Sequence, residues 1–214
     1  MTMRTGFILL CLFLLACCTR TTTEYWPSGV RKSEITVKNG VYDGPATYWN
    51  ESGNLQMECE YRNNKVHGKL KRYYITGVLE LEQQYAEGVP EGNLKTWDER
   101  GRLTSEGNYR QGKPDGRFTE YYPNSLLKVE GQYAHGDYDG IWLYYDTSGK
   151  VIGEGTFERG TGTQKAFHPD GRLKQITRYK DNRKHGDEIH YKPDGSVEVI
   201  NHYEEGRLVK KTRP

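Results

Sequence analysis

The chain has few of the residues that build an ordinary globular core or a cross-linked scaffold. Of its 214 residues only four are cysteine, three methionine, five phenylalanine and eight proline, and 34% are hydrophobic. So few cysteines, two of them adjacent, do not imply a disulfide framework. The formal net charge is only +2, so no strong basic field exists to hold nucleic acid. One hydrophobic run stands out, from Gly6 to Leu15, and it is too short to span a membrane comfortably.

Glycine is abundant, with 25 residues, and it recurs at a fixed interval. We take the recurring glycine as position 0 of each unit; successive steps are 24, 24, 24, 24, 22 and 24 residues, at Gly44, Gly68, Gly92, Gly116, Gly140, Gly162 and Gly186. Aromatic residues stand at positions 5 and 17 of every unit and an aliphatic residue at position 11. Such a short period indicates a repeat array, and it favours binding over catalysis because the array offers an extended surface rather than a deep pocket.

The middle of each unit is typical of a tight turn between two strands. Runs such as Pro169-Asp170-Gly171 favour a three-residue hairpin loop closed by a left-handed glycine. After the turn, apolar and polar residues alternate from Leu79 to Tyr85, which is the period of a half-buried strand. The predicted fold is therefore all-β: an elongated single-sheet solenoid of stacked antiparallel hairpins with a repeat of about 24 residues. Seven full units and a degenerate first unit, with Arg20 in place of the glycine, make about eight hairpins.

A three-residue loop predicts which residues face each other within a hairpin. It pairs position 5 with position 11, so that the repeated aromatics and aliphatics form one ladder. The same register pairs position 2 with position 14, where five units combine an apolar or small residue with glutamate: Ala46/Glu58, Leu70/Glu82, Leu94/Glu106, Phe118/Glu130 and Trp142/Glu154. In the last two units position 2 is polar and position 14 is apolar, as in Gln164/Ile176 and Glu188/Ile200. This joint exchange predicts that positions 2 and 14 are neighbours on one face.

The short step from Gly140 to Gly162 predicts a joint near residues 157–162. Its two missing residues fall in the connection between hairpins. We expect residues 25–157 to present one continuous outer surface and residues 162–206 to form a separate patch.

The N-terminal segment resembles a bacterial lipoprotein signal. A basic start and a short apolar run lead into Leu14-Leu15-Ala16-Cys17, which is similar to a lipobox. Residues 1–16 are then the signal peptide and Cys17 the lipid attachment site. Cys18 is the alternative, but cleavage there would leave Cys17 where a small residue is preferred.

The remaining boundaries follow from this interpretation. We expect a short tether at residues 17–24, the repeat array at residues 25–206 and a C-terminal tail at residues 207–214. The expected location is the bacterial cell envelope, with the protein lipid-anchored at the outer membrane or the periplasmic face rather than in the cytoplasm.

The units at residues 67–88 and 115–136, with their Gly-Lys-Leu-Lys-Arg-Tyr-Tyr and Glu-Gly-Gln-Tyr runs, resemble the variant MORN repeat of bacterial proteins. The resemblance covers about residues 25–206. It implies stacked hairpins and brings no catalytic residues. Some bacterial members are catalogued as antitoxins of toxin–antitoxin systems, and eukaryotic relatives serve as membrane-proximal scaffolds.

The repeated glutamates and their expected apolar neighbours form the candidate interaction surface. It comprises Glu58, Glu82, Glu106, Glu130 and Glu154 with Leu70, Leu94, Phe118 and Trp142, and Glu34 extends the column. Glutamates on every second strand lie about 10 Å apart, so they repel one another little. The column is either a solubility stripe or a docking strip for a basic protein, with the apolar residues as anchors.

Neither a cofactor nor a metal site is expected. His185, His190 and His202 share the last unit, but we expect them to be solvated because their repeat positions place them in a loop and on an outward face. No Ser/His/Asp or Cys/His arrangement interrupts the repeat, so we expect no enzyme activity.

The leading hypothesis is a non-enzymatic, lipid-anchored envelope protein whose array is a scaffold for a protein partner. One alternative is an antitoxin or immunity protein that neutralises a toxin. Another is a module that binds cell wall or glycan.

Overall fold

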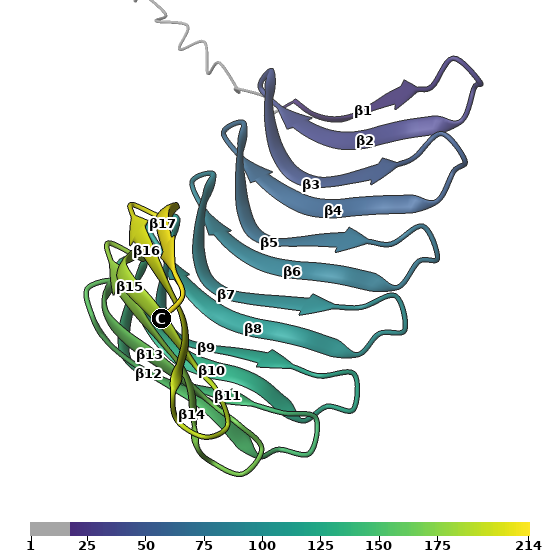
Figure 1. The fold of residues 1–214 in the computed structure, drawn as a ribbon. Coiled ribbons are helices and arrows are strands. Elements are labelled where there is room, and N and C mark those ends of the chain that lie inside the picture. Colours follow the sequence, from purple (N-terminus) through teal and green to yellow (C-terminus); the bar gives the residue numbers. More distant parts are fainter. Residues whose placement is uncertain (1–17) are drawn as a thin grey trace, which may run out of the picture.

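The computed structural model describes residues 18–214. The expected signal peptide and Cys17 lie outside the described residues. The described part consists of seventeen strands (Figure 1). They are β1 (Thr19–Tyr25), β2 (Arg31–Lys38), β3 (Val41–Trp49), β4 (Leu55–Arg62), β5 (Lys65–Tyr73), β6 (Leu79–Ala86), β7 (Val89–Trp97), β8 (Leu103–Arg110), β9 (Lys113–Tyr121), β10 (Leu127–Ala134), β11 (Asp137–Tyr145), β12 (Val151–Glu158), β13 (Thr161–Phe167), β14 (Leu173–Lys180), β15 (Arg183–Tyr191), β16 (Val197–Glu204) and β17 (Arg207–Thr212). No helix within residues 18–214 has the length and hydropathy to cross a membrane.

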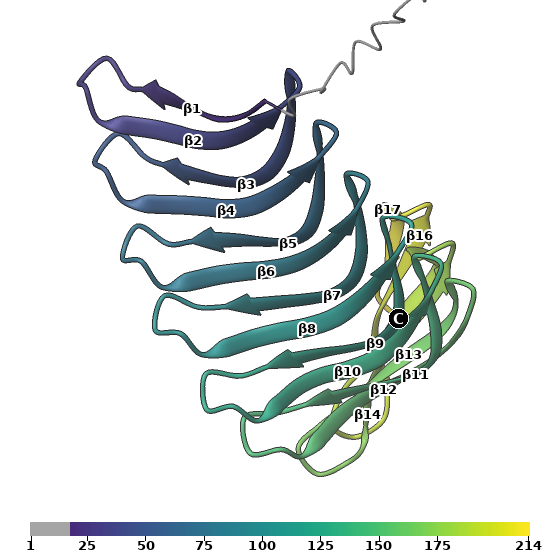
Figure 2. The same ribbon diagram turned by 180° about the vertical axis from the view of Figure 1, so that it is seen from behind.

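Each strand pairs antiparallel with the next one along the chain, from β1 to β17. The result is a single open sheet of consecutive hairpins, stacked in sequence order (Figures 1 and 2). The predicted all-β solenoid is therefore confirmed.

Both ends of the array extend further than the sequence indicated. The segment expected to be a tether forms β1, which pairs along its length with β2 from Thr19 opposite Lys38 to Tyr25 opposite Arg31. The segment expected to be a tail forms β17 against β16. Residues 19–25 and 207–212 are therefore edge strands of the sheet rather than a tether and a tail outside the array, because threonine-rich and valine-containing segments at a sheet edge gain a ladder of backbone hydrogen bonds.

A β-bulge changes the expected register inside every complete hairpin. Trp49 lies opposite Leu55, so the pairing of position 5 with position 11 is confirmed. Gln56 is then an extra residue, and Tyr48 lies opposite Met57. The same shift occurs in the other hairpins. One residue inserted into one strand moves every later side chain across to the next partner.

The bulge makes the predicted neighbours of positions 2 and 14 wrong. Glu58 lies opposite Thr47, and Ala46 lies opposite Cys59. Positions 2 and 14 therefore project from opposite faces of the sheet, since side chains alternate along a strand. We call the face with positions 2, 4, 13, 15 and 17 the aromatic face, and the face with positions 3, 5, 14 and 16 the carboxylate face. The aromatics at positions 5 and 17 consequently do not form one ladder.

The packed core lies on the aromatic face. Ile35, Ala46 and Cys59 are buried there. Partly buried neighbours complete the cluster: Tyr48, Met57, Tyr61, Val66 and Leu70. Further along, the rings of Phe118, Tyr133, Tyr138, Trp142, Phe157 and Tyr179 contact one another in sequence. Ring contacts of this kind tie each unit to the next.

Each hairpin is bent rather than flat (Figure 1), and the repeated glycine lies at an irregularity between units. The three residues from Glu58 to Glu60 in β4 oppose the five residues from His67 to Lys71 in β5. The extra pair includes Gly68, whose φ of 74° is easily adopted only without a side chain.

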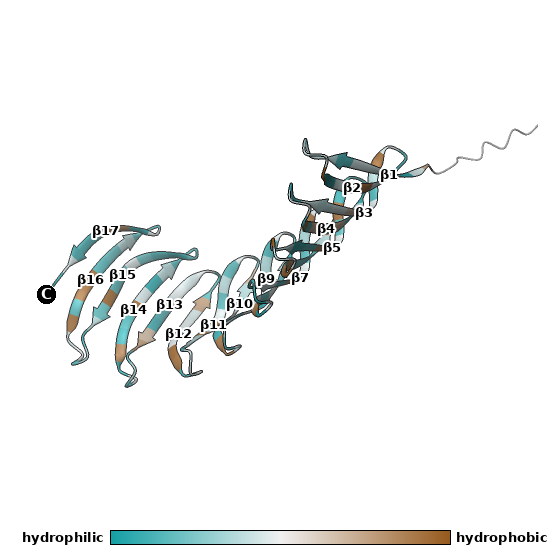
Figure 3. Ribbon diagram, turned by 90° about the vertical axis from the view of Figure 1, so that its right-hand side faces the viewer, coloured by the Kyte–Doolittle hydropathy of each residue, from teal (hydrophilic) through white to brown (hydrophobic). Residues whose placement is uncertain are grey.

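The ladder between β12 and β13 lacks this irregularity, and its register runs without a shift from Gly153 opposite Ala166 to Glu158 opposite Thr161. The turn itself has the same length as the turn between Arg62 and Lys65. The two residues missing from the short repeat are thus absent from β13, not from the connection where we placed them. In the side view the sheet changes direction before this ladder, since β1 to β7 run diagonally and β10 to β17 lie side by side (Figure 3).

The hairpin tips are joined in pairs by the residue at position 6. The hydroxyl of Tyr74 donates to the Trp97 carbonyl at 2.9 Å, and that of Tyr122 donates to the Tyr145 carbonyl at 2.8 Å. The Trp26 indole makes the equivalent bond to Trp49. In the intervening units position 6 accepts hydrogen bonds from its own turn instead, as in Asn50, Asp98 and Asp146. The 24-residue repeat is therefore organised locally as a repeat of two hairpins.

Candidate interaction surface

One row of directly opposed side chains crosses the sheet on the carboxylate face. Along this row, repeat position 14 on one strand alternates with repeat position 3 on the next strand. We call it the central row. Its members are Glu34, Thr47, Glu58, Lys71, Glu82, Lys95, Glu106, Thr119, Glu130, Leu143, Glu154, Lys165, Ile176, Ile189, Ile200 and Thr212. Directly opposite residues in such a ladder are about 5 Å apart. The glutamates are therefore separated by other side chains, two of which are the lysines Lys71 and Lys95.

Tyrosines at position 5 hydrogen-bond to three of these glutamates. The hydroxyl of Tyr73 donates to Glu58 at 2.6 Å, that of Tyr121 to Glu106 at 2.9 Å, and that of Tyr145 to Glu130. Each bond joins a tyrosine to the glutamate of the preceding unit.

These bonds shift the acidities of the groups that make them. Burial and the bond to Glu58 raise the pKa of Tyr73 to about 12. The bond to Glu130, together with burial, raises the pKa of Tyr145 to about 12. The pKa of the Glu106 carboxyl is lowered, chiefly because Tyr121 donates to its charged form. The phenols stay protonated and the carboxyl ionised at neutral pH.

Cations balance most of the expected glutamate column. Ion pairs join Glu82 to Lys69 at 2.9 Å, Glu106 to Lys95 at 3.5 Å, Glu130 to Arg117 at 3.1 Å and Glu154 to Lys165 at 3.3 Å. A basic partner would have to displace these cations before it could bind the carboxylates. The carboxylate face is therefore a mixed-charge surface rather than a bare acidic strip.

The four apolar residues proposed as anchors lie on the other face. Leu70, Leu94, Phe118 and Trp142 all occupy position 2, which the bulge moves to the aromatic face. The Trp142 side chain is only 2% exposed, and its indole Nε1–H donates to the Gln132 carbonyl at 3.1 Å. These residues belong to the core, so their placement beside the glutamates was wrong.

The two faces exchange character in the last two units. On the aromatic face, Glu188 is buried and accepts hydrogen bonds from Lys184, His190 and Asn201. Burial alone would raise its pKa, but these donors outweigh burial and lower the pKa to about 2. The joint inversion seen in the sequence therefore reflects two faces that exchange polarity, not two neighbouring residues.

On the carboxylate face the same units bring three isoleucines together. Ile176, Ile189 and Ile200 lie directly opposite one another in the central row and are half-buried. We call these three residues the isoleucine patch. Position 3, which supplies Ile189 and the lysines of the central row, was missed because the bulge was not recognised from sequence.

The three histidines of the last unit do not converge. His190 contacts Glu188 on the aromatic face, whereas Nδ1 of His202 lies 2.8 Å from Asp187 on the other face. Among residues 18–214, no group of three or more His, Cys, Asp or Glu side chains is arranged to hold a metal ion.

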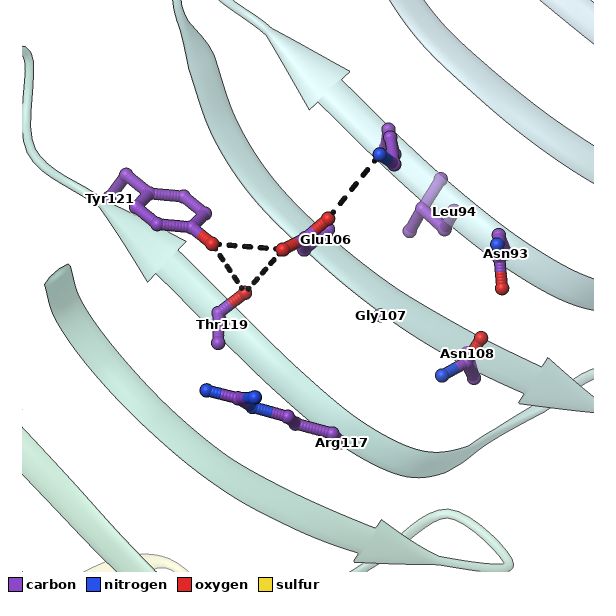
Figure 4. Close-up of a pocket in the computed structure, with 9 residues that line it drawn as sticks. Asn93, Leu94, Glu106, Gly107, Asn108, Arg117, Thr119 and Tyr121 are labelled. Carbon is purple, nitrogen blue, oxygen red and sulfur yellow. Dashed lines mark hydrogen bonds and ion pairs between the residues drawn. The ribbon is translucent and has the colours of Figure 1, made fainter. Parts of the chain in front are cut away.

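A polar hollow of about 340 Å³ lies beside Glu106 (Figure 4). Tyr121 and Thr119 bond to Glu106 at its wall, and Lys95 reaches the same carboxylate. Other polar side chains lining it are Asn93, Asn108 and Arg117. The hollow offers hydrogen-bond donors and acceptors together, which suits a polar side chain of another molecule better than an apolar one.

Comparison with known proteins agrees with this architecture. The family model described as MORN repeat variant matches residues 42–63, 114–135, 138–159 and 161–181. No curated protein sequence matches the chain significantly.

Similar solved structures include a crystal structure of the GtfA/B complex bound to UDP and GlcNAc, at 11% identity and a TM-score of 0.24 over 51% of this chain. Another is a crystal structure of TcdB2-TccC3-Cdc42, at 10% identity and a TM-score of 0.24 over 87% of this chain. The chain spans only 22% and 12% of those two chains, and scores this low support no argument about fold or function. The matched repeats and the stacked hairpins establish the family: the chain is a variant MORN-repeat protein.

Proposed function

We propose that the protein is a non-enzymatic, lipid-anchored scaffold of the bacterial cell envelope that binds another protein through its carboxylate face. MORN repeats are commonly repeats that bind proteins or membranes. An extended sheet with paired surface charges suits recognition of a macromolecule more than the chemistry of a small substrate.

The isoleucine patch is the observation that carries this proposal. Three isoleucines in one row on an open sheet face are unusual, because that face is charged or polar through most of the preceding units. Apolar residues bordered by charge are typical of protein interfaces. The patch supplies the anchor, and the ion-paired glutamates earlier in the central row set the orientation of the partner.

Cys17 supplies the membrane attachment in this proposal. β1 begins at Thr19, so lipid on Cys17 would hold the N-terminal edge of the sheet at the membrane surface. Replacement of Cys17 by Ser should leave an unprocessed or soluble protein in cell fractionation. Normal processing with unchanged membrane association would contradict the anchor.

Partner capture tests the binding surface. The full chain is cross-linked in cells to its neighbours, and three forms are compared: wild type, Ile189→Asp, and the double variant Glu106→Lys/Glu130→Lys. We expect Ile189→Asp to lose the captured protein and the charge reversal only to weaken capture, because rim charges contribute less than a desolvated anchor. Circular dichroism checks that each variant is folded. Loss with the charge reversal and full capture by Ile189→Asp would show that the glutamates are the docking strip instead.

A further inference from the structure

The open sheet has two terminal strands, and each has one edge without a neighbour. β1 pairs only with β2, and β17 pairs only with β16, among the described residues. Such an edge is a template for another strand unless charge, proline or a bulge protects it.

The two edges differ in this protection. β17 carries Arg207, Lys210 and Lys211 among its six residues, which disfavours pairing with another strand. β1 has four threonines, contains neither lysine nor proline, and carries one charge of each sign, Arg20 and Glu24, instead of three cations. Threonine is a good strand former, so β1 is the edge that can accept a partner.

The hydrogen bonds at the ends of β1 define which backbone groups face outward. The Cys18 carbonyl accepts from the Asn39 N–H at 3.2 Å, and the Trp26 N–H donates to the Val30 carbonyl at 2.8 Å. Bonded and non-bonded residues alternate along an antiparallel strand. Even-numbered residues of β1 therefore bond to β2, and Thr19, Thr21, Thr23 and Tyr25 direct their N–H and C=O groups away from the sheet.

The sequence of β1 is complementary to itself in reverse. When a second copy is centred on Thr22, Arg20 lies opposite Glu24 of that copy, and Glu24 opposite its Arg20. The outward residues pair with one another as well, Thr21 with Thr23 and Thr19 with Tyr25. A register moved by two residues loses the Arg20–Glu24 match.

We propose that two copies of this protein pair antiparallel through their β1 strands, with Thr22 at the twofold axis. The axis is perpendicular to the sheet, so both carboxylate faces lie on the same side of one continuous sheet. The two N-terminal ends of β1 lie about 20 Å apart, which is the length of the strand. A dimer of this kind would present two isoleucine patches at its far ends, but it does not depend on what they bind.

Disulfide trapping tests the register. Thr22 of each copy faces the other in a non-hydrogen-bonded pair, where Cα atoms lie about 4.5 Å apart, within disulfide range. In full-length chains carrying Cys18→Ser, we expect Thr22→Cys to give a covalent dimer on mild oxidation. Val209→Cys, on the exposed strand at the other edge, and the Cys18→Ser parent should not. No dimer from Thr22→Cys, or equal dimer from Val209→Cys, would overturn the proposal.

Charge exchange tests the same contact without cysteine. Two differently tagged full-length copies are co-expressed and one tag is purified. When both tagged copies carry Arg20→Glu, or both carry Glu24→Arg, purification should recover less of the second tag than it does from two wild-type copies. Arg20→Glu co-expressed with Glu24→Arg should restore recovery, because both cross-strand pairs are again opposite in charge. Unchanged recovery in the single variants, or no restoration in the mixed pair, would contradict the proposed pairing.

Thr21→Pro removes an N–H that is free in the single chain. Each copy of the dimer loses one donor, so recovery should fall about tenfold or more, while Thr21→Val should pair as well as wild type. Thermal unfolding of both variants shows whether β1 still packs on β2. Equal recovery for the folded Thr21→Pro variant would overturn pairing through this edge.

Discussion

Gly131 and Gly107 occupy the same repeat position, yet they should respond very differently to alanine. A Cβ atom on Gly131 would lie 2.2 Å from Cδ2 of Trp142 and 2.4 Å from its Cε2. A Cβ atom on Gly107 would lie 3.3 Å from Cδ2 of Phe118. Neither glycine has a positive φ, so the comparison isolates steric contact from backbone strain.

Trp142 has little room to move away from the added methyl group. It is 2% exposed, and its ring centroid lies 5.0 Å from that of Tyr133 and 4.8 Å from that of Tyr138. Overpacking of this kind typically costs about 1–3 kcal/mol. Replacing glycine in a strand returns about 0.5–1 kcal/mol of backbone entropy. We expect Gly131→Ala to lose about 1 kcal/mol of unfolding free energy after this return, and Gly107→Ala to be close to neutral.

Denaturant unfolding combined with hydrogen exchange measures this difference. Repeat arrays need not unfold in one step, so exchange should be followed in β9 to β12 separately from β1 to β6. The loss in Gly131→Ala should appear first in β9 to β12. Leucine is the natural residue at position 2 in two other units, so Gly131→Ala with Trp142→Leu should lose less than the sum of the two single changes. Equal stability of Gly131→Ala and Gly107→Ala, or strict additivity in the double variant, would refute the reasoning.

Three further predictions concern single hydrogen-bonded groups. The pKa of Glu188 is about 2 in the folded protein, against an ordinary value of 4.5. The ionised carboxylate therefore contributes about 3 kcal/mol to the free energy of unfolding above pH 4.5, and this contribution is lost as the pH falls toward 2. Glu188→Gln should be less stable than wild type at pH 7, and it should lose less stability than wild type between pH 4.5 and pH 2. Denaturant unfolding at a series of pH values measures both differences. Tyr122→Phe removes the bond to the Tyr145 carbonyl and should cost about 1 kcal/mol, seen as faster hydrogen exchange at the tip of the next hairpin. Tyr121→Phe should raise the pKa of the Glu106 carboxyl, because the Tyr121 hydrogen bond is the largest single cause of its lowering; a carboxyl NMR titration that finds no rise in this variant would contradict this.

The sequence alone determined the period, the fold class and the pairing next to each turn. These depend on local physics: turn residues such as Asp170-Gly171 and a strand period of two specify a hairpin without knowledge of its neighbours. The opposition of Trp49 and Leu55 follows from loop length and was predicted correctly. Membership in the variant MORN family was also apparent from the units themselves.

Only the tertiary structure decided which residues share a face. The extra residue that follows each turn, such as Gln56, leaves the alternation of apolar and polar residues nearly unchanged. These bulges nevertheless place Leu70 and Trp142 on the aromatic face and bring lysines between the glutamates. The strands at both ends and the regular ladder of β13 are likewise set by the strand beside them. A bulge or an edge strand is stabilised by cross-strand partners, and no single segment contains that information.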